Sequence, residues 1–136
     1  MSKKFKTRLT FLLLAIIIGA GVSQMEWIND THKHITPTEA AAMIQSDPSV
    51  IIVDVRREDE YVKKHIPNAV LLPIEKINAG QDIETTLPDK NRPLLLYCQT
   101  GRRAENAASK LAKMGYKHVY EFGGLVEWTG ATEGEE

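Results

Sequence analysis

A single cysteine is the residue in this chain best placed to do chemistry. Cys98, the only cysteine among 136 residues, follows the apolar run 94–97 and precedes a short polar turn. The apolar run is typical of a buried strand, and from residue 103 onward alanines and Leu111 recur at the spacing of one helix face. A thiol between a strand end and a helix N-terminus meets unpaired N–H groups and about half a positive charge. This pattern predicts a nucleophilic thiol beside an anion site.

The turn after the cysteine, 99–103, supports this interpretation. It contains Gly101 and two adjacent arginines, Arg102 and Arg103. An inert buried cysteine at a strand end is the alternative, since free cysteines are often buried, but it leaves the glycine and the arginines unexplained. These residues alone are compatible with a peroxidase-like, phosphatase-like or sulfur-handling thiol. A single cysteine excludes an intramolecular disulfide and a two-cysteine redox cycle within the chain.

Charge and metal-ligand spacing exclude other functions. Four basic residues precede residue 9, and without the first 23 residues the chain has 13 basic and 18 acidic residues, a net charge of −5. This balance argues against nucleic acid as a partner. The four histidines and the cysteine show no metal-ligand spacing, and His32 and His34 are interpreted as surface residues. No metal and no cofactor are expected.

The N-terminal segment has the pattern of an export signal. Residues 1–23 combine a basic start, an apolar stretch from Leu9 to Ala20, and the small-x-small sequence Gly21-Val22-Ser23. The apolar stretch is short for a membrane span, which needs about 20 residues. We expect a cleaved signal peptide and a periplasmic domain. The alternative is an uncleaved anchor through residues 9–22, and this anchor would be the chain's only membrane contact.

The rest of the chain alternates strand and helix patterns, which predicts one α/β domain with an open parallel sheet covered by helices on both faces. A polar lead-in, 24–34, precedes the domain, 35–129, and an acidic tail, 130–136, is expected to fray. The predicted strands lie at Ile35, 50–55, 70–72, 94–97 and 118–122. The predicted helices begin at a Thr36 cap, near Glu58, at 73–74 and at 103, and a short one follows Gly123-Gly124. Residues 80–90 are expected to be irregular.

Several of these pieces, taken in order, resemble the rhodanese family over about residues 35–129. They are Asp54-Val55-Arg56, Glu60-Tyr61, His65-Ile66-Pro67-Asn68-Ala69, the turn from Cys98 to Ala104, Gly115-Tyr116, and Gly123-Gly124-Leu125 with Trp128. The family's common His-Ile-Pro-Gly-Ala motif is preceded by a glycine. Lys64 replaces that preceding glycine here, and Asn68 replaces the glycine within the motif. Asparagine tolerates left-handed backbone, so we expect this turn to survive.

The resemblance implies a rhodanese-like fold and a thiosulfate sulfurtransferase. Cys98 would carry a persulfide between an anionic donor, thiosulfate, and a cyanide or thiol acceptor. Backbone N–H groups of Gln99, Thr100, Gly101 and the two arginines would surround the sulfur. Arg103 is the better candidate for donor contact, and Arg102 occupies a variable position.

The resemblance also gives Asp54 and Arg56 a role. They would hold the loop and the neighbouring helix in place, although a purely structural salt bridge is the favoured interpretation. A monomer is expected.

Three rival functions remain. Related phosphatases and arsenate reductases use Cys-x5-Arg, and the position of that arginine here is Ala104, so the shorter loop favours sulfur over a tetrahedral oxyanion. A non-catalytic binding or sensory module commonly lacks the cysteine that this chain keeps. A protein persulfide carrier would use the same cysteine, and sequence does not separate it from the small-molecule enzyme.

Overall fold

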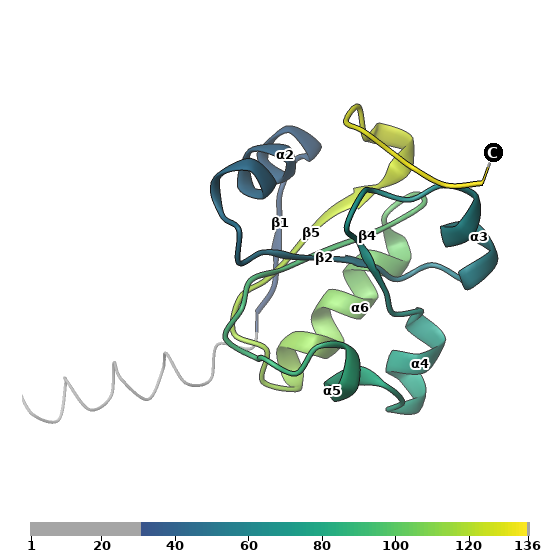
Figure 1. Cartoon of the computed structure of the whole chain (residues 1–136). Helices are drawn as coiled ribbons and strands as arrows, with labels where there is room; N and C mark the ends of the chain where they lie inside the picture. Colours follow the sequence, from purple (N-terminus) through teal and green to yellow (C-terminus); the bar gives the residue numbers. More distant parts are fainter. Residues whose placement is uncertain (1–30, 136) are drawn as a thin grey trace, which may run out of the picture.

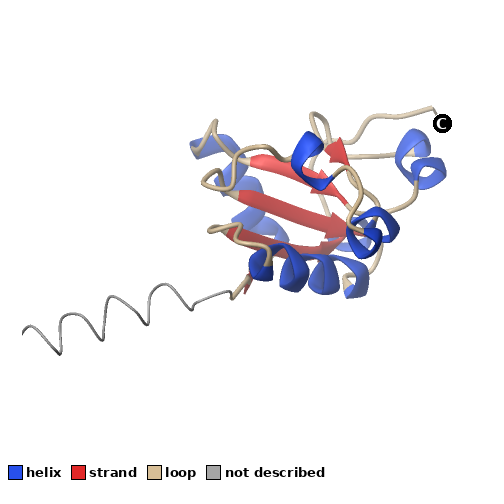
Figure 2. Cartoon of the chain, turned by 90° about the horizontal axis from the view of Figure 1, so that it is seen from below, coloured by secondary structure: helices blue, strands red, loops and turns tan. Residues whose placement is uncertain are grey.

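The computed structural model describes residues 31–135, which fold around a five-stranded parallel sheet with the order β1-β5-β4-β2-β3 (Figure 1). The strands are β1 (Lys33–His34), β2 (Ile51–Asp54), β3 (Val70–Leu71), β4 (Leu94–Cys98) and β5 (Val119–Gly124). In Figure 2 the strands lie side by side with their arrowheads toward the same edge. The predicted parallel α/β fold is confirmed. The predicted signal segment, 1–23, lies outside the described residues.

Helices cover both faces of the sheet, as the alternating pattern predicted (Figure 1). The helices are α2 (Pro37–Ser46), α3 (Glu58–Lys63), α4 (Ile74–Ala79), α5 (Ile83–Thr86), α6 (Arg102–Lys113) and the 3-10 helix η1 (Leu125–Glu127). One hydrophobic cluster joins β4 to α4, α5 and the alanine face of α6. A second joins the other face of the sheet to α2, α3 and η1. Of the described helices, none is long and apolar enough to cross a membrane.

Local signals account for the starts of several elements. Thr36 caps α2 in a capping box with Glu39, because its side chain accepts from the Glu39 N–H at 3.1 Å while Glu39 accepts from the Thr36 N–H at 3.2 Å. Asn68 has a φ of 67°, the left-handed backbone expected there. In the same turn, the Ile66 N–H donates to the Tyr97 hydroxyl at 3.0 Å, which ties the turn to the central strand.

Three predicted element boundaries were wrong. The first strand is Lys33–His34 and ends before Ile35. The segment 80–90 is not wholly irregular, because Ile83 and Leu87 are buried one helical turn apart and make α5 a packed helix. Gly123 and Gly124 continue β5 instead of starting a turn. In each case pairing or burial against distant residues overrode the local composition.

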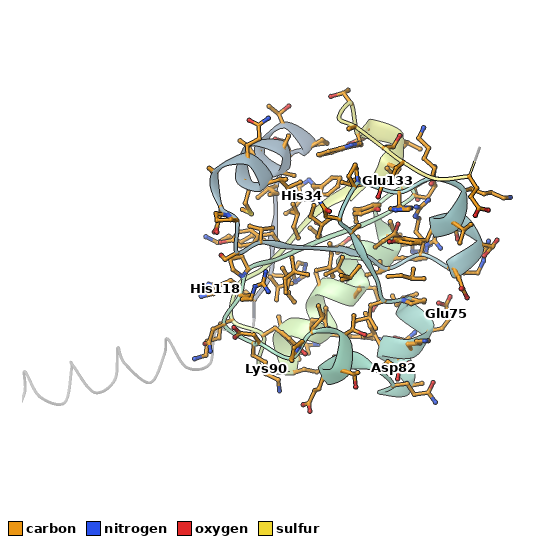
Figure 3. The ribbon with its side chains drawn as sticks, in the orientation of Figure 1. His34, Glu75, Asp82, Lys90, His118 and Glu133 are labelled. Carbon is orange, nitrogen blue, oxygen red and sulfur yellow. The ribbon has the colours of Figure 1, made fainter. Side chains whose placement is uncertain are left out.

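The acidic tail does not fray over its described residues. Glu133 and His65 form an antiparallel bridge through two backbone hydrogen bonds of 2.8 and 2.9 Å, and the Glu135 N–H donates to the Val62 carbonyl at 2.9 Å. A Cβ at Gly134 would lie 2.3 Å from the Lys63 carbonyl oxygen, so the backbone packs closely there. Figure 3 shows Glu133 far from Asp82 and Lys90, which flank α5. The hydrogen bonds to Val62 and His65 therefore place the tail across the end of α3.

Candidate active site

The thiol of Cys98 lies at the carboxyl end of the central strand, β4, and faces the N-terminus of α6. Its sulfur accepts the N–H of Gly101 at 3.0 Å and the N–H of Ala104 at 3.4 Å. The residue is only 1% exposed, and its sulfur lies 3.7 Å from the Gly123 carbonyl oxygen. Two N–H donors at a helix N-terminus stabilise negative charge on this sulfur.

Glycines allow the chain to close around this sulfur. Gly101, the residue before α6, has a φ of 118°, and a Cβ on it would lie 3.2 Å from the Gly123 Cα. A Cβ on Gly124 would lie 2.1 Å from the Gln99 carbonyl oxygen. That carbonyl also accepts the N–H of Val126 at 3.3 Å. The end of β5 is therefore packed directly against the Cys98 loop, which requires glycine on both sides.

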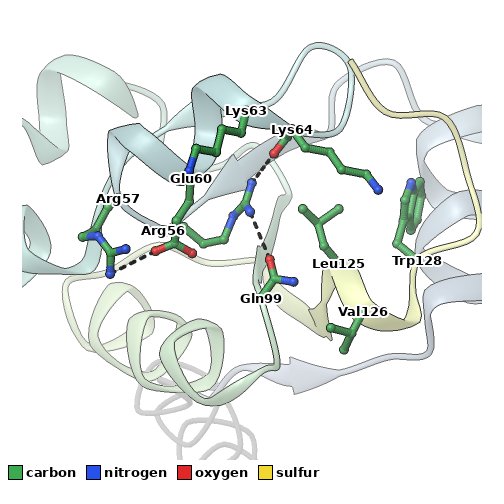
Figure 4. A pocket seen from close by; sticks show the side chains of 9 residues that line it. All are labelled: Arg56, Arg57, Glu60, Lys63, Lys64, Gln99, Leu125, Val126 and Trp128. Carbon is green, nitrogen blue, oxygen red and sulfur yellow. Dashed lines mark hydrogen bonds and ion pairs between the residues drawn. The ribbon is translucent and has the colours of Figure 1, made fainter. Parts of the chain in front are cut away.

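Asp54 and Arg56 form a buried ion pair beneath this loop. Arg56 donates to both oxygens of Asp54, at 3.0 Å from Nε and 2.7 Å from Nη2. Its other contacts are the Gln99 side-chain oxygen at 3.1 Å and the Lys64 carbonyl at 2.5 Å (Figure 4). Burial lowers the pKa of Arg56, but the hydrogen bonds and charge of Asp54 outweigh burial and leave that pKa raised. The pair reaches the loop through Gln99, which is the contact a supporting role needs.

The guanidinium of Arg103 is paired with the carboxylate of Glu60, a residue that the sequence did not assign to the site. Its Nη1 and Nη2 donate to the two oxygens of Glu60 at 2.8 and 2.9 Å, and Arg57 lies 3.3 Å from the same carboxylate. These hydrogen bonds are the main reason that the pKa of Glu60 is lowered. They also raise the pKa of Arg103, to which the negative charge of Cys98 contributes further. Arg103 thus lies near Cys98, although its side-chain hydrogen bonds go to Glu60 on α3.

The remaining predicted loop residues are more open. Gln99 is half-buried, whereas Thr100 and Arg102 are exposed to solvent. Hence the structure brings together Cys98, Gly101, Gln99 and Arg56, and it turns Arg102 outward.

A cavity of about 700 Å³ opens beside the loop (Figure 4). One side is apolar and the other is mostly basic; the lining residues are Arg56, Arg57, Glu60, Lys63, Lys64, Gln99, Leu125, Val126 and Trp128. The sequence did not predict most of this lining, because α3 and η1 are distant in the chain from the Cys98 loop and from each other. Glu60 and Trp128 did appear within motifs, but without a role.

The described residues contain no cluster of three or more metal-ligating side chains. The Nδ1 of His34 lies 2.6 Å from an oxygen of Glu121, whose other oxygen accepts the N–H of Gly123 at 2.9 Å. His34 is thus exposed and pairs with the buried carboxylate of Glu121, which also binds the backbone N–H of Gly123. The Cys98 sulfur therefore faces two backbone N–H groups, an environment that suits a sulfur nucleophile.

Comparison with known proteins gives this geometry a family. Residues 36–131 match the rhodanese-like domain. Thiosulfate sulfurtransferase PspE of Escherichia coli strain K12 is 37% identical over 75 residues, covering 55% of this chain and 70% of that protein. The putative sulfur carrier protein YrkF of Bacillus subtilis strain 168 is 36% identical over 91 residues, covering 66% of this chain but 47% of that protein.

Among solved structures, the rhodanese with anions from E. coli superposes with a TM-score of 0.58 at 31% identity, covering 63% of this chain and 99% of that one. The domain match, these relatives and the superposition agree on one fold. The chain belongs to the rhodanese family, and its relatives support a sulfurtransferase activity.

Proposed function

We propose that this protein is a thiosulfate sulfurtransferase that carries sulfur as a persulfide on Cys98. The observation that carries the proposal is the Cys98 sulfur, which accepts two N–H groups at the N-terminus of α6. A relative named thiosulfate sulfurtransferase supports the choice of donor. The proposed acceptor is cyanide or a thiol.

The proposed reaction has two balanced steps. The Cys98 thiolate attacks the outer sulfur of thiosulfate, the sulfur–sulfur bond of the donor breaks, and sulfite leaves with the electron pair. The acceptor then takes the terminal sulfur, and the bond to Cys98 returns its electrons to the thiolate. The N–H groups of Gly101 and Ala104 stabilise the sulfur anion in the resting form, and the loop N–H groups do the same for the persulfide.

The test is sulfur transfer by the purified full chain from thiosulfate to cyanide, measured as thiocyanate. Cys98→Ser is expected to abolish it, because the hydroxyl is a poor sulfur carrier. Intact mass after thiosulfate treatment should rise by ~32 Da in the wild type and not in the variant. Equal thiocyanate production by the two proteins would refute the role of Cys98.

A persulfide carrier between proteins is the second candidate. The similarity to a putative sulfur carrier supports it. In that case the wild type fails with free thiosulfate but accepts sulfur from a protein persulfide, again through Cys98. A non-catalytic module would accept sulfur from neither.

We also propose that residues 1–23 export the domain to the periplasm, either as a cleaved monomer or held by an uncleaved anchor. The basic start and apolar stretch of this segment support the proposal. Cell fractionation and the N-terminus of the fractionated protein test both alternatives. A full-length chain in the cytoplasmic fraction would contradict export.

A further inference from the structure

Glu60 is paired with the guanidinium of Arg103, the group that an anionic donor would bind. Arg103 presents two N–H groups in a planar fork, and both are paired with the two oxygens of Glu60 at 2.8 and 2.9 Å. The Glu60 side chain is 17% exposed and that of Arg103 is 30% exposed, so the pair lies at the edge of solvent. A sulfonate or carboxylate would bind the same fork with the same geometry.

Two other arginines near the loop are also paired with carboxylates. Arg56 is neutralised by the buried Asp54. Arg57 is shared between Glu60 at 3.3 Å and Asp59 at 3.0 Å. The two backbone N–H groups that contact the sulfur serve one negative charge on Cys98. A donor whose second negative charge binds Arg103 must therefore displace Glu60 or lie near its carboxylate.

Building on the sulfurtransferase proposed above, we infer that Glu60 is a specificity-determining residue of this site. Its carboxylate competes with the donor for Arg103. This competition weakens the use of dianionic donors relative to singly charged donors that deliver the same kind of sulfur. The site is thereby biased away from inorganic thiosulfate and toward donors of lower charge.

A matched pair of donors isolates this effect. Thiosulfate and methanethiosulfonate both present an outer sulfur to the Cys98 thiolate, and in both the sulfur–sulfur bond breaks. Sulfite leaves with the electron pair in the first case and methanesulfinate in the second. The donors differ by one negative charge on the departing group, which is the charge that Glu60 is proposed to oppose.

The experiment compares the full-length wild type with Glu60→Gln, which keeps the shape of the side chain and removes its charge. The ratio of kcat/KM for thiosulfate to kcat/KM for methanethiosulfonate should rise by about fivefold, the size of one partly exposed charge interaction. The change should appear as a lower KM for thiosulfate. If Glu60 served only to hold Arg103 in place, the KM for thiosulfate would rise instead, and that result would overturn the inference.

Asp59→Asn is the matched control. It removes the same charge from the neighbouring position of α3, where Asp59 pairs with Arg57 and its side chain is 62% exposed. The donor ratio should stay near that of the wild type. An equal rise in Asp59→Asn would mean that net charge, and not the contact with Arg103, sets the preference.

Alkylation of Cys98 gives a readout that does not need sulfur transfer. Iodoacetate is anionic and iodoacetamide is neutral, and the single cysteine makes the adduct unambiguous by intact mass. Glu60→Gln should raise the iodoacetate-to-iodoacetamide rate ratio over that of wild type. An unchanged ratio would overturn the inference even if thiosulfate is turned over. A raised ratio in a chain that never turns over thiosulfate would uphold the role of Glu60 and refute the proposed donor.

Discussion

At the scale of single residues, the site depends on which hydrogen bonds the sulfur and the arginines make. The Cys98 sulfur is held by backbone N–H groups of Gly101 and Ala104, so its environment depends little on side chains. Arg103 differs, because its side chain interacts electrostatically with Cys98 while bonding to Glu60. We therefore expect the arginine side chains to affect donor binding, whereas backbone N–H groups contact the sulfur itself.

Removing the Arg103 side chain should affect donor binding more than the chemical step. In Arg103→Ala we expect the KM for thiosulfate to rise by roughly tenfold, as for loss of a charge-assisted contact, with a smaller change in kcat. Steady-state kinetics with Arg102→Ala as the comparison checks this, since Arg102 is the exposed neighbour. An unchanged KM in Arg103→Ala would remove this arginine from the donor site.

At the scale of elements, α3 brings charge to a loop that belongs to β4 and α6. The pair between Glu60 on α3 and Arg103 on α6 contributes to stability in a pH-dependent way, because hydrogen bonds from Arg103 lower the pKa of Glu60 in the folded protein. A carboxyl group with a lowered folded pKa stabilises the fold above its unfolded pKa. That stabilisation is lost as the pH falls through the folded pKa.

We therefore expect Glu60→Gln to be less stable than wild type at neutral pH, by about 1 kcal/mol for a partly exposed pair. The difference should hold down to the ordinary range of glutamate, at about pH 4.3, and disappear at lower pH. Urea denaturation of both proteins across this range measures it. A difference that is independent of pH would show that the lost packing of the side chain matters and its charge does not.

At the scale of the whole molecule, the C-terminal tail joins the two sides of the cavity. Trp128 and Lys64 both line the cavity, and the bridge between Glu133 and His65 lies just beyond Lys64. The tail thus links the end of η1 to the end of α3, the helix that carries Glu60 and Lys63. A segment that looks like a terminus in the sequence helps to shape the site.

Deleting residues 130–136 should destabilise the protein by roughly 1–3 kcal/mol, since three backbone hydrogen bonds to α3 and the following turn are lost. Denaturation and amide hydrogen exchange at His65 check this. Glu133→Gln is the control, because it keeps the backbone bridge and should change stability little. An equally stable truncated protein would show that the tail merely rests on the surface.

Much of the fold was predictable from sequence. Short apolar runs and a helical alanine face predict β4 and α6 correctly because burial and periodicity act over a few residues. The Thr36 capping box and the left-handed turn at Asn68 are equally local. The elements that sequence missed, α5 and the docked tail, are polar segments ordered by partners far along the chain, which composition does not reveal.

The sequence by itself determined that one cysteine sits at a strand end before a helix, with glycine and arginines in the turn. That is enough to predict a reactive thiol, because the N–H groups that surround it come from its own loop. Only the tertiary structure decided what the arginines bind. Glu60 lies 43 residues from Arg103, and Arg56 lies 43 residues from Gln99. Contacts of this range are set by how α3 packs over the sheet, and the sequence carries no local signal for them.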